Sequence, residues 1–137
     1  MKALIMKPFS FMSFLLFTLI SCQDDPQVSL NVSDEMEFSG TFETIQSDNV
    51  SGSVTLLISN GHYESTTNLP FGYGAGRIEL SGNTINFVDT AFFIIPALYG
   101  PAYPLSGKHT YNFDGQHLTL WRKKNVGSLI YNLQVVN

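Results

Sequence analysis

Few residues in this chain are of types that do chemistry, and they are widely spaced. The chain has one cysteine, Cys22, and three histidines, His62, His109 and His117. A zinc site is built from Cys or His residues that recur at short, regular spacings, and no pair here has such a spacing. Strand alternation also predicts that His109 points into the protein and His117 away from it. We therefore expect no metal site and no cofactor.

The motifs of common enzyme classes are missing from the sequence as well. The segment Gly72–Gly76 lacks the Gly-Lys-Ser/Thr ending and the following helix of a phosphate-binding loop. No Gly-x-Ser-x-Gly elbow occurs, and no two acids share an apolar run that would raise the pKa of one. Glu43, Glu64 and Glu79 alternate with apolar neighbours and are expected on an outer face. The patterns predict a protein that is not an enzyme; a hydrolase whose catalytic groups meet only in the fold is the alternative.

Cys22 lies at the end of an apolar stretch near the start of the chain. Lys2 and Lys7 provide positive charge, Phe9–Ile20 is apolar, and a small residue precedes the cysteine. This is the three-part pattern of a cleaved secretory signal peptide, here residues 1–21. The apolar stretch is 12 residues long. A transmembrane helix needs about 20, so a retained membrane span is the weaker alternative.

The residues Leu19-Ile20-Ser21-Cys22 resemble the lipobox of bacterial lipoproteins. The resemblance implies a diacylglycerol thioether on Cys22, an acyl group on its amine after cleavage, and attachment to the outer membrane. Gln23-Asp24-Asp25 resemble the surface-export signal of Bacteroidetes lipoproteins, which would expose the protein at the cell surface. A solvated acidic linker explains the same three residues, and ordinary secretion with a spectator cysteine is the alternative to lipidation.

The chain after the signal is short and acidic. Its 116 residues are enough for one domain and include five basic and eleven acidic side chains. This balance argues against nucleic acid as a partner, because phosphate binding needs clustered Lys and Arg. The one basic cluster, Arg122-Lys123-Lys124, is expected to be a solvated turn. Residues 22–35 are polar and lack periodicity, which predicts a flexible acidic tether before a domain of residues 36–137.

Alternating apolar and polar residues, interrupted by turn residues, predict an all-β domain. The eight expected strands are about Met36–Ile45, Ser51–Ser59, His62–Leu69, Ala75–Ser81, Thr84–Thr90, Gly107–Phe113, Gln116–Arg122 and Ser128–Val136. Three adjacent pairs are separated by two-residue turns of the favoured hairpin type, namely Asn60-Gly61, Gly82-Asn83 and Asp114-Gly115.

These turns set registers that agree with the apolar pattern. The pairs expected to face each other are Leu80 with Ile85, Ile78 with Phe87, Tyr111 with Leu118, and His109 with Leu120. Around the first turn the expected inner face is partly polar and comprises Val54, Leu56, Ile58, Tyr63, Ser65 and Thr67. A slip of one residue would move each apolar set to the solvent face, which a buried core forbids.

Eight consecutive antiparallel strands close most simply into an up-and-down barrel, which leaves no sheet edge unpaired. Gly40-Thr41-Phe42 in the first strand, Leu105-Ser-Gly, Tyr111-Asn-Phe-Asp-Gly and Leu118-Thr-Leu resemble small lipocalin-like barrels found among periplasmic and surface lipoproteins. The resemblance implies an eight-stranded antiparallel barrel over residues 36–137, with space inside for side chains or one small ligand.

Short and long connections alternate, so the two ends of the barrel should differ. The two-residue turns and the tether share one end, and the longer connections lie at the other. One of these, Ala91–Ser106, is uncharged and apolar and contains three prolines. It must either plug the barrel mouth or bind something, since connecting loops are ordinarily polar. The candidate ligand-binding residues at this end are Phe71, Tyr73, Phe92, Phe93, Tyr99 and Tyr103.

We therefore expect a lipid-anchored, non-enzymatic barrel that binds a small apolar molecule or another protein at its long-loop end. Its membrane partner would be reached through the lipid on Cys22. The alternative is a protein-interaction, inhibitor or assembly lipoprotein whose interior is filled. Asp89-Thr90-Ala91 resembles an acceptor site for O-glycosylation in exported Bacteroidetes proteins, and an ordinary strand end explains the same residues.

Overall fold

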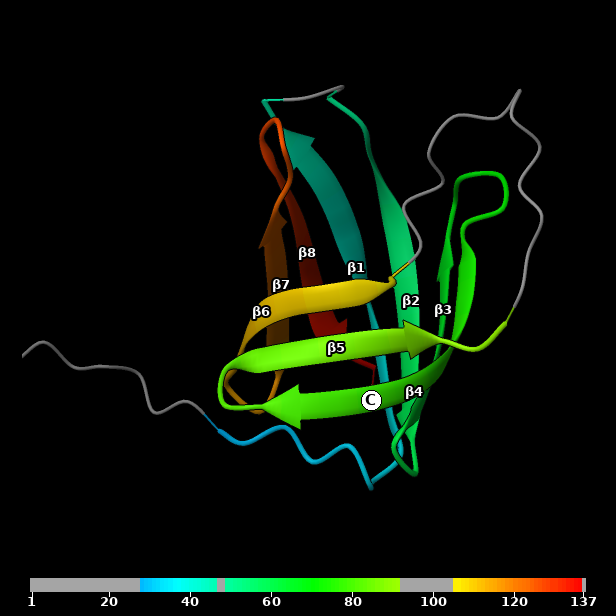
Figure 1. Ribbon diagram of the computed structural model, residues 1–137. Coiled ribbons are helices and arrows are strands. Elements are labelled where there is room, and N and C mark those ends of the chain that lie inside the picture. The colour runs from blue at the N-terminus through cyan, green and yellow to red at the C-terminus, as the bar shows by residue number, and fades with distance from the viewer. Residues whose placement is uncertain (1–27, 47–48, 92–104, 137) are drawn as a thin grey trace, which may run out of the picture.

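The computed structural model describes residues 28–46, 49–91 and 105–136. Eight antiparallel strands form a closed barrel in sequence order, with β8 paired back to β1 (Figure 1). The strands are β1 (Met36–Ile45), β2 (Ser51–Ser59), β3 (His62–Thr67), β4 (Tyr73–Ser81), β5 (Thr84–Asp89), β6 (Gly107–Phe113), β7 (His117–Lys123) and β8 (Ser128–Val135). The predicted all-β, up-and-down barrel is confirmed. The described residues form no helix, and so none that could cross a membrane.

The barrel wall follows the alternation of the sequence. In β2, the side chains of Val54, Leu56 and Ile58 are buried, whereas the intervening Thr55 and Leu57 face outwards. Successive side chains of a strand point to opposite faces, so every second residue enters the interior. All eight strands contribute buried apolar residues in this way. Together they form one core, whose removal from water is the main stabilising contribution to the fold.

Two of the three predicted hairpin turns are confirmed. Ser59 pairs with His62 across the first turn and Ser81 with Thr84 across the second. Asn60 and Gly61 both have positive φ, at 51° and 75°, the backbone that a tight hairpin between twisted strands needs. The predicted inner face around the first turn is also confirmed, because its six residues are all buried.

The apolar pair beside the second turn is only half buried. Leu80 faces Ile85 as predicted, and Ile85 is fully buried. Leu80, however, remains 37% exposed. Leu80 lies two residues from Gly82, at the tight-turn end of the barrel. Few residues lie beyond it to cover its side chain.

The third turn is longer than predicted. Phe113 pairs with Leu118 and Tyr111 with Leu120, and the three residues 114–116, rather than two, connect β6 to β7. The Asp114 carboxylate explains this turn, because its Oδ1 accepts hydrogen bonds from the backbone N–H groups of Gln116 at 2.8 Å and His117 at 2.6 Å. The register differs by two residues from the predicted one. A shift of two keeps every side chain on its face, so the apolar pattern fits both registers.

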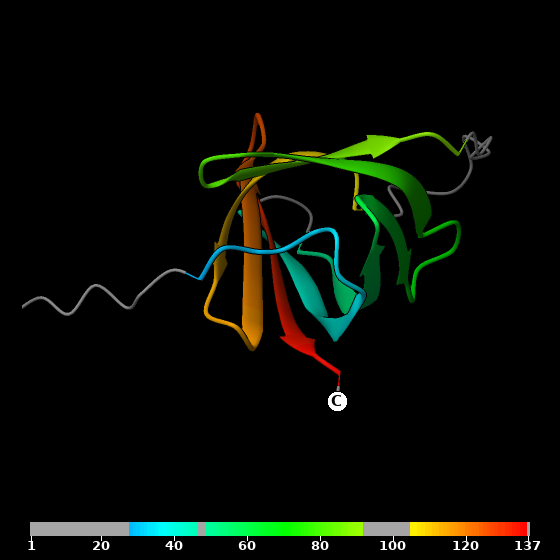
Figure 2. The same ribbon diagram turned by 90° about the horizontal axis from the view of Figure 1, so that it is seen from below.

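Residues 28–35 lie across the tight-turn end of the barrel (Figure 2). Leu30 is only 2% exposed and belongs to the core. The Val28 N–H donates to the Phe113 carbonyl at 2.9 Å, and the Val32 carbonyl accepts from Gly61 N–H at 2.8 Å. This segment was expected to be tether. Instead it packs against the barrel and covers one of its two ends, because its apolar residues can bury themselves there.

Candidate binding site at the long-loop end

The structure describes two of the predicted ligand-binding residues. Phe71 lies in the connection between β3 and β4, and Tyr73 begins β4. Both are at the long-loop end and both are partly exposed, Phe71 by 43% and Tyr73 by 37%. The other predicted residues, Phe92, Phe93, Tyr99 and Tyr103, lie outside the described residues, as does the predicted lipidation site Cys22.

Phe71 has an unusual backbone for its residue type. Its φ is +59°, in the left-handed region that large side chains avoid. Such strain costs on the order of 1–3 kcal/mol and occurs more often at binding and catalytic sites than elsewhere. The strained, exposed aromatic side chain therefore marks the β3–β4 connection as a candidate contact point for a partner.

Aromatic rings form a connected series inside the barrel. Tyr63 of β3 contacts Phe87 of β5, with ring centroids 4.9 Å apart, and Phe87 contacts His109 of β6 at 5.8 Å. The His109 ring then contacts Tyr131 of β8 at 5.7 Å, and Tyr131 contacts Phe42 of β1 at 5.9 Å. The first three contacts are edge-to-face, which is favourable because the positive ring edge meets the negative ring face, and the last is tilted. All five rings are buried in the core of the barrel.

The inner wall is polar towards the long loops. Five polar residues point inwards within the last three positions of their strands at this end: Thr44, Ser65, Thr67, His109 and Arg122. We call this set the polar rim. At the tight-turn end the inward residues next to the turns are mainly apolar, as Ile58, Phe113 and Leu118 illustrate. The two ends of the interior therefore differ in chemistry as well as in cover.

Three buried atoms of the polar rim have no hydrogen-bond partner. They are Ser65 Oγ, His109 Nε2 and Arg122 Nε, the three such side-chain atoms found in the described part of the chain. Leaving a buried donor or acceptor unsatisfied costs about 1–3 kcal/mol, so most native proteins avoid it. A ligand that completes these hydrogen bonds would recover that free energy. This makes the polar rim the candidate binding site.

His109 presents a neutral acceptor to the interior. Its Nδ1 lies 3.1 Å from the Gly107 carbonyl oxygen. A carbonyl only accepts hydrogen bonds, so Nδ1 carries the proton and Nε2 the lone pair. Burial lowers the pKa of His109 to about 4, and the charge of Arg122 contributes to the same shift. The imidazole is therefore uncharged near neutral pH.

Arg122 lies beside His109 and presents a charged donor. The register that pairs Thr110 with Trp121 brings these two residues opposite each other in the neighbouring strands. One guanidinium nitrogen, Nη1, donates to the Ser106 carbonyl at 2.9 Å. Arg122 was predicted as the last residue of the strand Gln116–Arg122 and, with Lys123 and Lys124, as part of a solvated turn. It lies within β7 and points inwards, since the alternation of Leu118 and Leu120 continues to it.

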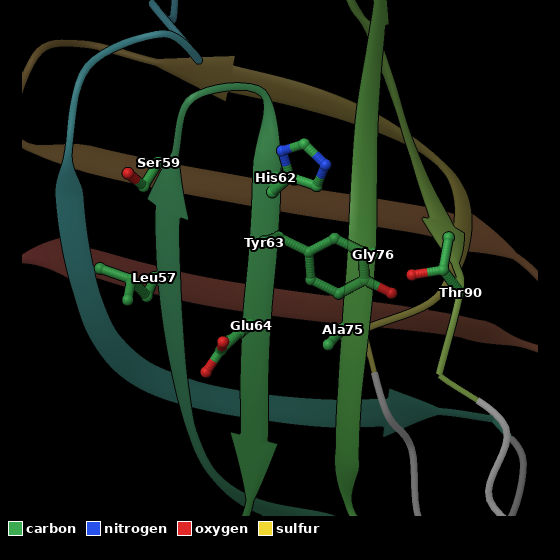
Figure 3. Close-up of a pocket in the computed structure, with 8 residues that line it drawn as sticks. All are labelled: Leu57, Ser59, His62, Tyr63, Glu64, Ala75, Gly76 and Thr90. Atoms are coloured by element: carbon green, nitrogen blue, oxygen red, sulfur yellow. The ribbon is translucent and has the colours of Figure 1, made fainter.

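A second feature, on the outer surface, is a groove of about 250 Å³ over β2, β3 and β4 (Figure 3). It is lined by Leu57, Ser59, His62, Tyr63, Glu64, Ala75, Gly76 and Thr90. The wall is thin here because Gly76 has no side chain; a Cβ would collide with the Val88 carbonyl. The lining combines one carboxylate, one imidazole, a leucine, a tyrosine and four small residues, and none of these residues has an unsatisfied buried side-chain atom.

Tyr63 reaches across this thin part of the wall to Asp89. Its hydroxyl donates to Asp89 Oδ1 at 3.1 Å, and the same oxygen accepts from Ala75 N–H at 3.2 Å. Burial raises the pKa of Tyr63, and the Asp89 carboxylate raises it further, so the hydroxyl keeps its proton. The contact ties β3 to β5 across β4. Sequence reasoning missed it, because nothing local connects residues 26 positions apart.

The remaining predicted chemical residues are dispersed. His62 and His117 are exposed beside turns at the tight-turn end, whereas His109 lies near the long-loop end; the outward position predicted for His117 is confirmed. Within the described residues, no group of three or more His, Cys, Asp and Glu side chains is arranged to hold a metal ion. Comparisons with family models, with curated protein sequences and with solved structures found no match to this chain.

Proposed function

We propose that this protein is a lipid-anchored lipoprotein of the bacterial cell envelope whose barrel is a non-enzymatic binding module. It takes a small, largely apolar ligand at its long-loop end. The observation that carries the proposal is the polar rim, with three buried atoms that lack partners. A barrel that served only as a stable scaffold would replace such residues with apolar ones, because each unsatisfied atom is destabilising.

The cover on the opposite end supports the same location. Residues 28–35 close the tight-turn end and bury Leu30 in the core. A ligand would therefore enter between the long loops. The interior next to the polar rim is apolar, since the rings that contact His109 are those of Phe87 and Tyr131.

The proposed anchor gives this end a direction. Cys22 precedes Val28 by six residues, a reach of at most about 20 Å even when fully extended. The Val28 N–H is hydrogen-bonded to the Phe113 carbonyl at the tight-turn end. Lipid on Cys22 would then hold that end towards the membrane, and the polar rim would face away from it. In this arrangement the ligand is exchanged with the aqueous side or with a neighbouring protein.

The binding proposal is tested by native mass spectrometry of the protein purified from its own membranes. We expect a bound species of low mass, one per chain, that denaturation removes and that incubation of the refolded protein with a cell extract restores. A protein that carries no such species from its membranes and acquires none from extract would refute ligand binding.

The anchor is tested separately by Cys22→Ala. We expect this variant to leave the membrane fraction, because it loses the only thiol that can carry the lipid. Its barrel should keep the thermal stability of the wild type. Membrane fractionation of both proteins makes the measurement, and an unchanged distribution would contradict the lipidation of Cys22.

A protein partner is the second candidate, favoured by the strained and exposed Phe71. Asn tolerates positive φ better than Phe, so Phe71→Asn should leave the free energy of unfolding unchanged or raise it by about 0.5–1 kcal/mol. Capture of an envelope protein should be lost in this variant. The matched control is Leu80→Asn, which removes an exposed apolar side chain at the opposite end. Equal capture by both variants would argue against docking through Phe71.

A further inference from the structure

The side chain of Arg122 carries a charge for which no described residue supplies a counter-charge. Among the described residues, the ion pairs are Arg77 with Glu79 and His117 with Asp114, all on the outer surface. The other members of the polar rim are Thr44, Ser65, Thr67 and the neutral His109. A half-buried cation without a nearby anion is destabilising, because it loses hydration and gains no ion pair.

The unpartnered donor of the guanidinium belongs to an edge that can bind a carboxylate. Nη1 is engaged by the Ser106 carbonyl, whereas Nε is buried and has no partner. Arginine offers two parallel N–H donors along its edge, and a carboxylate accepts both with two oxygens. Lysine could not provide this geometry. The hydrogen bond from Nη1 to the Ser106 carbonyl also restricts the arginine side chain, so less conformational entropy is lost when a ligand binds.

His109 presents an uncharged hydrogen-bond acceptor beside the charge of Arg122. Its Nε2 is an unsatisfied acceptor within a side chain that is 99% buried, at 1% exposure. A second cation here would repel Arg122, and a carboxylate would neutralise it. A neutral imidazole does neither, so the net charge of the polar rim stays positive. The rings that contact His109 on either side, those of Phe87 and Tyr131, carry no charge.

We infer that the ligand of the polar rim is an organic acid, whose carboxylate pairs with Arg122 at the end of the apolar interior. This inference rests on the proposed binding function and specifies its ligand class. A hydroxyl or N–H group on the ligand, next to the carboxylate, would satisfy His109 Nε2 in addition.

The test compares hydrocinnamate with hydrocinnamyl alcohol, which has the same ring and chain but no charge. Both are titrated by calorimetry into the intact lipoprotein in detergent. We expect the acid to bind at least about tenfold more tightly than the alcohol, the size of a charge-assisted hydrogen bond. Arg122→Gln should abolish this preference, and Arg122→Lys should reduce it, since Lys keeps the charge without the paired donors.

Arg77→Gln is the matched control, because it removes an exposed arginine from the outer surface. Equal binding of acid and alcohol to the wild type would overturn the inference, as would a preference that survives Arg122→Gln. Binding of neither probe would also overturn it. A low-mass species in native mass spectra would then still support the binding module, so the two proposals can fail separately. Should Arg122→Gln not fold, the comparison on the wild type alone decides.

Discussion

At the scale of single residues, the unusual positions of this barrel are polar residues in an apolar interior. His109 and Ser65 are almost completely buried, and each has an atom without a partner. Arg122 brings a charge into the same region and contributes to the lowered pKa of His109. Buried polar atoms without partners lower the free energy of unfolding, and the barrel fold does not require them. Their placement is best explained by a ligand, which is why the proposed site rests on them.

His109 predicts how stability depends on pH. Its pKa falls from 6.5 to about 4 on folding, so the unfolded chain takes up the proton first as the pH is lowered. The free energy of unfolding should therefore decrease between about pH 6.5 and pH 4, by up to about 3 kcal/mol. Urea unfolding across this range measures the effect.

His109→Gln is the control for this titration. It keeps a side-chain donor for the Gly107 carbonyl but has no group that titrates. Its stability should vary much less over the same range. Asp114, whose pKa is lowered to about 2, contributes stability that is lost only as the pH falls from about 3.8 towards that value. An equal pH dependence in His109→Gln would exclude His109 as the cause.

At the scale of elements, the turns decide the registers of the strands. The β6–β7 connection shows how one side chain selects a turn. Asp114 accepts two backbone hydrogen bonds and its other oxygen lies 3.0 Å from His117 Nδ1. In this arrangement residues 114–116 connect the two strands, whereas the Asp-Gly dipeptide alone suggests a connection of two residues. The residue pairs across β6 and β7 are partly polar, so their apolar pattern is compatible with either length of the connection.

We expect Asp114→Ala to lower the melting temperature, because the N–H groups of Gln116 and His117 lose their acceptor. Asp114→Asn keeps an acceptor oxygen and should remain close to the wild type at neutral pH. Thermal unfolding of both variants makes the comparison. A drop of the same size in both would show that the charge of Asp114, rather than its hydrogen bonds, holds the turn.

At the scale of the whole molecule, the barrel is closed differently at its two ends. The strands remove all sheet edges, and residues 28–35 cover the tight-turn end through Leu30. The polar rim occupies the other end. The two ends of the barrel therefore differ in both chemistry and cover. With the proposed anchor on Cys22, this difference would give the molecule an orientation relative to the membrane.

Leu30→Ala should lower the free energy of unfolding by about 2–4 kcal/mol, because it removes buried methyl groups and leaves a cavity under the cover. Val28→Ala, at a side chain that is 43% exposed, should change it by less than about 0.5 kcal/mol. Chemical denaturation of both variants provides the values. If the two variants were equally stable, residues 28–35 would not be part of the folded unit.

The sequence by itself determined which residues face inwards. Strand positions and faces follow from a period of two, which is a local property that each strand carries alone. The same alternation extends to Arg122 and, before the first strand, to Leu30 and Val32. The inward position of Arg122 was obscured by the basic run Arg122-Lys123-Lys124. That of Leu30 was obscured by the polar residues around it.

Only the tertiary structure decided which inward residues meet. The register of β6 and β7, the contact of Tyr63 with Asp89 and the cover formed by Leu30 all join segments that are distant in sequence or equivalent in pattern. The unsatisfied atoms of the polar rim belong to this class too. Whether a buried polar atom has a partner depends on every strand around it, and a barrel brings those strands together only when it closes.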